Sequence, residues 1–202
     1  MGMIDLITGG IGTKVITALA GKLGISETKA KWMVAIAVPL MIAALKYNSS
    51  KKSEQAESLN NALDNKHTGD ALDRVDQIVT DGPSEDDDKI INHMFGKNSD
   101  QVKNEIASKT GISSETVGTV LSTLAPIVMA YIGKEKAAQS NSGGIGDLLG
   151  GLLNGGASDS ASANGQQQQS SGGGIADLVS GFFDKNKDGN FLDDIAGMFT
   201  KK

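Results

Sequence analysis

An internal repeat constrains this chain more than any other feature of its sequence. The segment ALAGKLGIS returns later as EIASKTGIS, and each copy is followed by an apolar stretch that contains one proline. Gly24 and Gly111 are 87 residues apart, and so are Pro39 and Pro126, so the two copies align without a gap. Such a repeat indicates that one structural unit has been duplicated.

Each copy predicts two helices joined by a sharp turn. Apolar residues recur at helical spacing before the turn, and a glycine at the turn suits the left-handed conformation that ends many helices. Ser26 and Ser113 follow the two turns, where their hydroxyls are placed to cap the next helix. Pro39 and Pro126 fall well inside those second helices and are expected to bend them. We therefore expect two kinked helices that pack as a pseudo-symmetric pair.

The most apolar stretch, residues 32–45, raises the question of whether it spans a membrane. As a helix its 14 residues would extend about 21 Å, whereas the hydrocarbon core of a bilayer is about 30 Å thick. The matching helix of the second copy carries Thr119, Ser122 and Thr123 among its apolar residues. We interpret both stretches as core helices, with a proline-kinked membrane or interfacial helix as the alternative.

These features predict an all-α protein with a helical domain, a linker and a tail. The domain is 1–138, made of copies at about 3–50 and 90–138 and an acidic helical connector at 53–89. Residues 139–174 are rich in Ser, Gly, Asn and Gln, and such a composition buries too little apolar surface to offset the entropy of ordering. They predict a flexible low-complexity linker, followed by a C-terminal tail at 175–202.

A short Asp-led apolar motif occurs three times in the chain. GMIDLITGG at the start is matched much later by GIGDLLGGLLNGG and, 30 residues after that, by GIADLVSGFF. Each motif is too short to be a stable helix alone, so each predicts a docking segment that folds against a groove or another copy. The alternative is low-complexity drift. The candidate interaction residues are Asp5, Leu6, Asp147, Leu148, Asp177 and Leu178.

The tail sequence DKNKDGNFLDDI has the first half of an EF-hand calcium loop. The candidate ligands are Asp184, Asn186, Asp188, Asn190 and Asp194. The first four hold positions 1, 3, 5 and 7 of the loop, but position 12 is Ile195 rather than a bidentate glutamate. The hypothesis is weak calcium binding through a non-standard loop, and the alternative is an Asn-Gly turn before a helix.

The two-helix unit also has the spacing of a helix-turn-helix. In the first copy Lys29 and Lys31 lie beside Trp32 on the would-be recognition helix, whereas the matching stretch of the second copy, SSETVGTVLSTLAP, carries Glu115 and has no Lys or Arg. DNA affinity requires positive charge, and the net charge of the chain is −5. Plain packing geometry is therefore the favoured interpretation.

Residues suited to catalysis are few. No cysteine is present, which excludes thiolate nucleophiles and thiolate metal ligands, and His67 and His93 belong to no metal-binding pair. Asp86, Lys89 and His93 share one helical face, which we interpret as solvated surface. The chain start lacks the basic and long apolar regions of a secretory signal, which favours the cytoplasm. We expect no enzyme and no cofactor beyond the calcium of the hypothesis.

The stretch beginning LITGGIGTKVITALAGKLGIS, continued by DDKIINHMFGKNSDQVKNEIASKTGIS, resembles the bacterial family catalogued as domain of unknown function 937, related to YidB-like proteins. The likeness rests on the paired GIS turns, the prolines in the apolar helices and IINHMFG before the second copy, and it covers roughly residues 3–138. The tail also looks like tails seen in that family. The resemblance implies an all-α fold and no assigned reaction.

The function that these patterns favour is a non-enzymatic self-associating or scaffold protein. Its expected partner is another copy or another protein, rather than nucleic acid or a membrane. The alternatives are a helix-turn-helix DNA-binding protein and, third, a membrane-associated protein.

Overall fold

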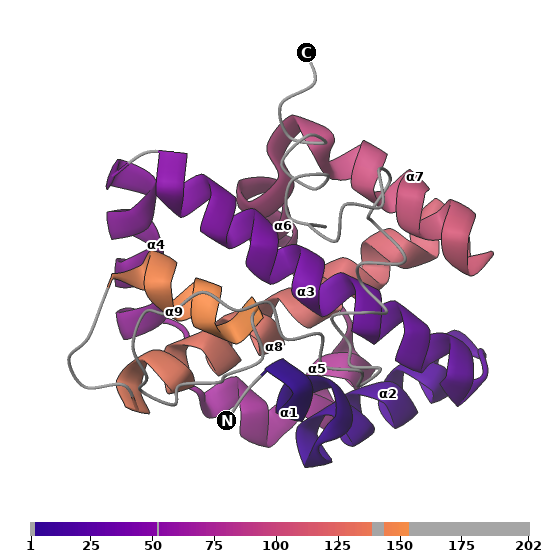
Figure 1. Ribbon diagram of the computed structural model, residues 1–202. Coiled ribbons are helices and arrows are strands. Elements are labelled where there is room, and N and C mark those ends of the chain that lie inside the picture. Colours follow the sequence, from indigo (N-terminus) through magenta and orange to yellow (C-terminus); the bar gives the residue numbers. More distant parts are fainter. Residues whose placement is uncertain (1–2, 52, 139–143, 154–202) are drawn as a thin grey trace, which may run out of the picture.

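The computed structural model describes residues 3–51, 53–138 and 144–153, and this part of the chain is all-α (Figure 1). The predicted fold class is therefore confirmed. The helices, of which η1 and η2 are 3-10 helices, are α1 Met3–Thr8, α2 Gly10–Leu23, α3 Glu27–Lys51, α4 Ser53–Asn65, η1 Asp70–Arg74, α5 Val75–Asp81, α6 Glu85–Phe95, η2 Gly96–Asn98, α7 Ser99–Thr110, α8 Ser114–Ala138 and α9 Ile145–Leu153.

The duplication is visible in the helix boundaries. α3 and α8 each contain 25 residues, and both their first and their last residues are 87 positions apart. α2 and α7 end at Gly24 and Gly111, whose φ angles are 62° and 67°. Nothing lies within 4 Å of a Cβ built on either glycine, so the left-handed backbone, and not lack of space, favours glycine there. The two turns thus share one geometry, as the sequence predicts.

The helices after these turns begin in the same way. Ser26 Oγ accepts a hydrogen bond from the Lys29 N–H at 3.3 Å, and Ser113 Oγ accepts one from the Thr116 N–H at 3.2 Å. Each bond satisfies one N–H group that the start of a helix leaves unpaired. Pro39 and Pro126 then lie inside α3 and α8 at equivalent positions, and the two helices pack against each other.

α3 lies at the centre of the fold (Figure 1). Every residue from 33 to 45 is buried. A helix that is apolar all round must be covered on every side, and α2, α4, α8 and α9 provide that cover. α8 is buried in the same way, and its Thr123 Oγ1 donates a hydrogen bond to the carbonyl oxygen of Thr119 at 2.8 Å. The two apolar stretches therefore form the core of the fold.

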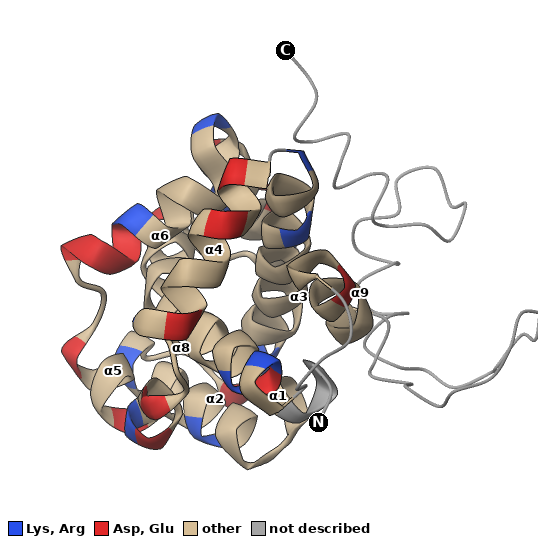
Figure 2. Ribbon diagram, turned by 90° about the vertical axis from the view of Figure 1, so that its left-hand side faces the viewer, with Lys and Arg blue, Asp and Glu red and all other residues tan. Residues whose placement is uncertain are grey.

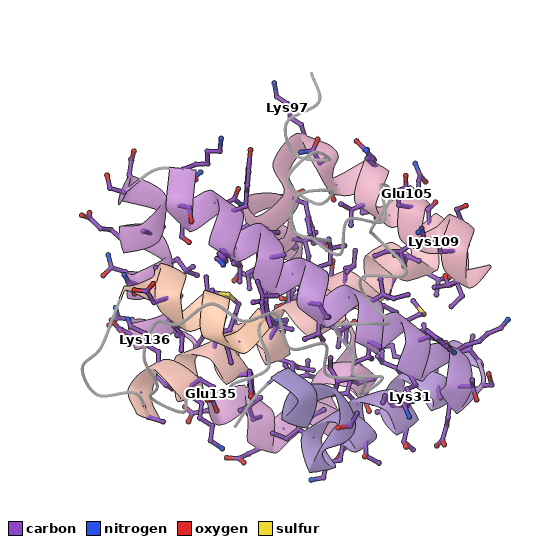
Figure 3. The ribbon with its side chains drawn as sticks, viewed as in Figure 1. Lys31, Lys97, Glu105, Lys109, Glu135 and Lys136 are labelled. Carbon is purple, nitrogen blue, oxygen red and sulfur yellow. The ribbon has the colours of Figure 1, made fainter. Side chains whose placement is uncertain are left out.

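The acidic connector folds into α4, η1, α5 and the beginning of α6. α4 packs on α3 and α8, and Lys136 Nζ at the end of α8 lies 2.7 Å from Asp64 Oδ1 on α4 (Figure 3). α5 packs on α2, where Lys22 Nζ donates a hydrogen bond to the carbonyl oxygen of Thr80 at 2.9 Å. The connector thus joins the two units by covering both.

α6 begins inside the range assigned to the connector. A capping box starts it: Asp87 Oδ2 accepts a hydrogen bond from the Ser84 N–H at 2.8 Å, and Ser84 Oγ accepts one from the Asp87 N–H at 3.3 Å. Acidic residues gather at this helix start, where the helix dipole stabilises negative charge (Figure 2). α6 therefore crosses the predicted boundary between the connector and the second copy.

A packed helix lies inside the range predicted as a linker. α9 occupies residues 145–153, within the segment 139–174 whose average composition is that of a flexible link. The difference has a physical reason, because these nine residues concentrate five apolar side chains at helical spacing, and their burial offsets the entropy of ordering.

Candidate functional site

α9 packs mainly on α3 and also contacts α4 and α8, and Figure 2 shows it beside α3. We call the surface that these three helices present to α9 the α9 seat. The side chains that α9 buries in it are spaced i, i+3, i+4, i+7 and i+8, which is one stripe of a helix. None of them is more than 9% exposed, and they are Ile145, Leu148, Leu149, Leu152 and Leu153.

The opposite face of α9 is open. Asp147 is exposed, and nothing lies within 4 Å of a Cβ built on Gly146 or Gly151. At Gly150 a Cβ would lie 3.2 Å from Lys46 Nζ, which is the flexible end of a long side chain. The seat therefore contacts five apolar side chains of α9 closely, and larger side chains can be accommodated on the open face of α9.

α1 is a second Asp-led segment docked on the same central helix. It packs on α2 and α3, and its Leu6 and Ile7 are 2% and 1% exposed. When the motifs are aligned on their aspartates, these two residues match Leu148 and Leu149 of α9. A Cβ on Gly12 would collide with the carbonyl oxygen of Ile7, so the glycine allows α1 to approach α2.

The other predicted site residues lie outside the described residues. These are Asp177 and Leu178 of the third Asp-led segment and the calcium ligands Asp184, Asn186, Asp188, Asn190 and Asp194. Within the described ranges, no group of three or more His, Cys, Asp or Glu side chains is placed to hold a metal ion.

A cleft of about 470 Å³ is lined by both His67 and His93. Side chains from α3, α4 and α6 line it, and its lining includes the apolar Leu45, Leu59 and Met94. The two histidines are 26 residues apart, with His67 after α4 and His93 on α6, so no sequence pattern indicates that they line one cleft. The only available signal is the shared face of α6 that carries Asp86 and His93.

Three charged groups of this cleft, Asp86, Asp87 and Lys89, have partners at the start of α6. Lys89 Nζ lies 2.7 Å from Asp86 Oδ1, and this hydrogen bond lowers the pKa of Asp86. Asp87 is held in the capping box. Burial lowers the pKa of His67, and the positive charge of Lys66 lowers it further, while Asp87 acts in the opposite direction. The cleft thus combines an imidazole that resists protonation with an apolar lining.

α2 and α3 are consecutive helices joined by the turn at Gly24 and packed on each other, but the starts of α3 and α8 expose different chemistry. Lys29 and Lys31 are exposed at the start of α3, and Trp32 is 42% exposed (Figure 3 labels Lys31). The equivalent positions of α8 are Thr116, Gly118 and Thr119. Positive charge on this surface therefore belongs to the first unit.

α3 and α8 are each long and apolar enough to cross a membrane when judged by length and composition. In each helix 78% of the most apolar window is buried inside the fold. Core helices of folded domains pass the same test.

The fold and its seat define a class of protein, a duplicated all-α domain on whose central helix short Asp-led helices dock. A family model described as bacterial protein of unknown function (DUF937) matches residues 5–135, and the chain belongs to this family. The match spans both units and their connector and ends before α9. Searches of curated proteins and of solved structures found no match to this chain.

Proposed function

We propose that this protein is a non-enzymatic self-associating scaffold in which Asp-led apolar segments join copies. The observation that supports this is the burial of α9 on α3. A helix of nine residues is not stable alone in water, so α9 depends on the contacts of its five buried side chains. One chain therefore contains both a short docking helix and a seat that accepts it.

Self-association follows if a seat in one copy accepts a segment from another. The sequences on both sides of α9, at 139–143 and 154–174, have the Gly-, Ser- and Gln-rich composition of the predicted linker. An empty seat would leave apolar surface of α3 uncovered, and exposed apolar surface of this kind favours association. Copies would then join through the contact that α9 makes within one chain.

The test is the mass of the full chain by light scattering after gel filtration, over a range of concentrations. We expect a mass above the 20.9 kDa of one chain that rises with concentration. Leu178→Asp should reduce it, because a charge replaces an apolar residue of the third segment. Ser170→Asp places the same charge in the linker sequence and should leave the mass unchanged. A mass of one chain at every concentration would contradict the proposal.

Calcium binding by the tail is a separate proposal, tested by calorimetry on the full chain. We expect heat of binding on titration with calcium, and its loss in the double variant Asp184→Asn, Asp188→Asn. The equivalent change at two acids outside the loop, Asp159→Asn with Asp177→Asn, is the matched control. Absence of heat of binding in the unmodified chain would show that the tail does not bind calcium.

A second candidate function, DNA binding, is favoured by the exposure of Lys29, Lys31 and Trp32 near the start of α3. Its test is binding to nonspecific duplex DNA at low salt, where phosphate contacts are strongest. Lys29→Glu with Lys31→Glu should abolish binding, whereas Lys103→Glu with Lys109→Glu on α7 of the second unit should not. No binding at low salt excludes this candidate.

A further inference from the structure

We propose that residues 175–183 bind the α9 seat and compete with α9 for it. This inference rests on the proposed function, because it identifies which segment fills a seat when copies associate. It begins from the five positions that α9 buries. At an offset of 30 residues all five are apolar again, as Ile175, Leu178, Val179, Phe182 and Phe183.

The remaining positions also agree with the open face of α9. Asp177 matches the exposed Asp147, which lies in the first turn where a negative charge favours the helix. Ala176 replaces Gly146, where the space around a Cβ is empty. The seat therefore accepts the second sequence at these two open-face positions.

One open-face position requires an adjustment. Ser180 replaces Gly150, whose Cβ would meet Lys46 Nζ at 3.2 Å. The lysine end is flexible and can turn away, and it can then donate a hydrogen bond to the serine hydroxyl. This difference does not exclude the second segment from the seat.

The buried positions indicate which of the two segments, α9 or residues 175–183, fits the seat better. Phe182 and Phe183 replace Leu152 and Leu153, which are 2% and 4% exposed in the seat. Adding volume to a well-packed site forces neighbouring side chains to move and reduces stability. α9 also follows α8 after a short connection. α9 is therefore the preferred occupant, and residues 175–183 take the seat when α9 leaves it.

The chain is long enough for this exchange. Residues 154–174 give 21 positions between the two segments, and a Gly- and Ser-rich link of that length has a root-mean-square extension of about 25 Å. That distance allows the second segment to reach the seat of its own chain or of a neighbouring copy. Occupancy of the seat by α9 thus limits how much of the second segment is bound.

The experiment measures hydrogen exchange of the full chain by mass spectrometry. Leu149 is completely buried in the seat, so Leu149→Asp should release α9. We expect exchange of residues 175–183 to slow at least tenfold in this variant, and the slowing to disappear when Leu178→Asp is added. Gly151→Asp places the same charge on the open face and should leave exchange at 175–183 unchanged. Equal exchange of 175–183 in the unmodified chain and in Leu149→Asp would overturn the inference.

A second measurement uses the unmodified protein and does not depend on the folding of a variant. A synthetic peptide of residues 173–184 is added in excess, and exchange of α9 is followed. Displacement should speed exchange of residues 145–153, and the same peptide with Leu178→Asp should not. Unchanged α9 exchange at saturating peptide would also overturn the inference.

The mass of the same samples separates this inference from the proposed function. Slow exchange at 175–183 in Leu149→Asp with the mass of one chain means that the segment binds its own seat, so competition holds and self-association fails. A larger mass with fast exchange at 175–183 means that copies join by another contact, so self-association holds and the competition fails.

Discussion

The side-chain amide of Asn48 lies 2.8 Å from the carbonyl oxygen of Met94, and the same Nδ2 lies 3.1 Å from that of His93. Asn48 is near the end of α3 in the first unit, and Met94 is in the last turn of α6 in the second. The last carbonyls of a helix have no partner within it, so Asn48 satisfies two groups that would otherwise depend on water. One side chain thus joins the two units beside the histidine cleft.

Asn48→Ala should lower the free energy of unfolding by about 1–3 kcal/mol, because it leaves two carbonyl oxygens of α6 without their donor. The measurement is urea unfolding followed by circular dichroism. Asn65→Ala is the matched control, since Asn65 Nδ2 donates only to the carbonyl oxygen of Asn61 at the exposed end of α4. A loss no greater than that of the control would show that the bond between the units contributes little.

Two glycines of α8 should respond oppositely to alanine. A Cβ on Gly133 would collide with the backbone carbonyl oxygen of His67, so Gly133→Ala should destabilise the fold by about 3 kcal/mol. On Gly118 a Cβ meets only the side chain of Lys103, at 3.5 Å, so Gly118→Ala should stabilise the helix by about 0.5–1 kcal/mol. Thermal unfolding of the two variants measures both changes. Similar effects of the same sign would refute the close approach of α8 to His67.

The repeat allowed the fold class, the turn glycines and the serine caps to be predicted, because these depend on chemistry within a few residues. Gly24 and Gly111 need a left-handed backbone, and Ser26 and Ser113 need only a nearby N–H group. The place of α9 was predictable only in part. Its motif predicts a docking segment, whereas the average composition around it predicts a flexible linker. Only the packing of α9 on α3 decides between these two predictions.

Other features depend on packing between distant residues. His67 follows α4 and His93 lies on α6, and neither segment indicates in its own pattern that the two histidines line one cleft. The same is true of the bond between Asn48 and Met94, since an asparagine in a helix is compatible with many partners. Such contacts follow from the whole core and leave no signal in a short stretch of sequence.

Stability should depend on the protonation of His67. Because burial and Lys66 lower its pKa below the ordinary 6.5, the unfolded chain takes up a proton at a higher pH than the folded chain does. The free energy of unfolding should therefore fall as the pH drops through 6.5 toward the lowered pKa. Urea unfolding between about pH 7.5 and 5.5 measures this fall, and His67→Gln should reduce it. An equal fall in both proteins would mean that other groups cause it.

Replacing the glycine of either duplicated turn should lower the free energy of unfolding by the same amount, and the two losses should be additive. At Gly24 and Gly111 the backbone is left-handed and the space around a Cβ is empty, so alanine at either position should cost about 1 kcal/mol from backbone strain alone. Gly21→Ala is the matched control: the space around its Cβ is also empty, but it lies within α2, so alanine there should stabilise by about 0.5–1 kcal/mol. Because nothing lies within 4 Å of a Cβ on either glycine, the added methyl groups share no partner, so Gly24→Ala and Gly111→Ala together should cost the sum of the single variants. Urea unfolding of the four variants measures these differences. A combined loss well beyond that sum would show that the two units are coupled through their turns.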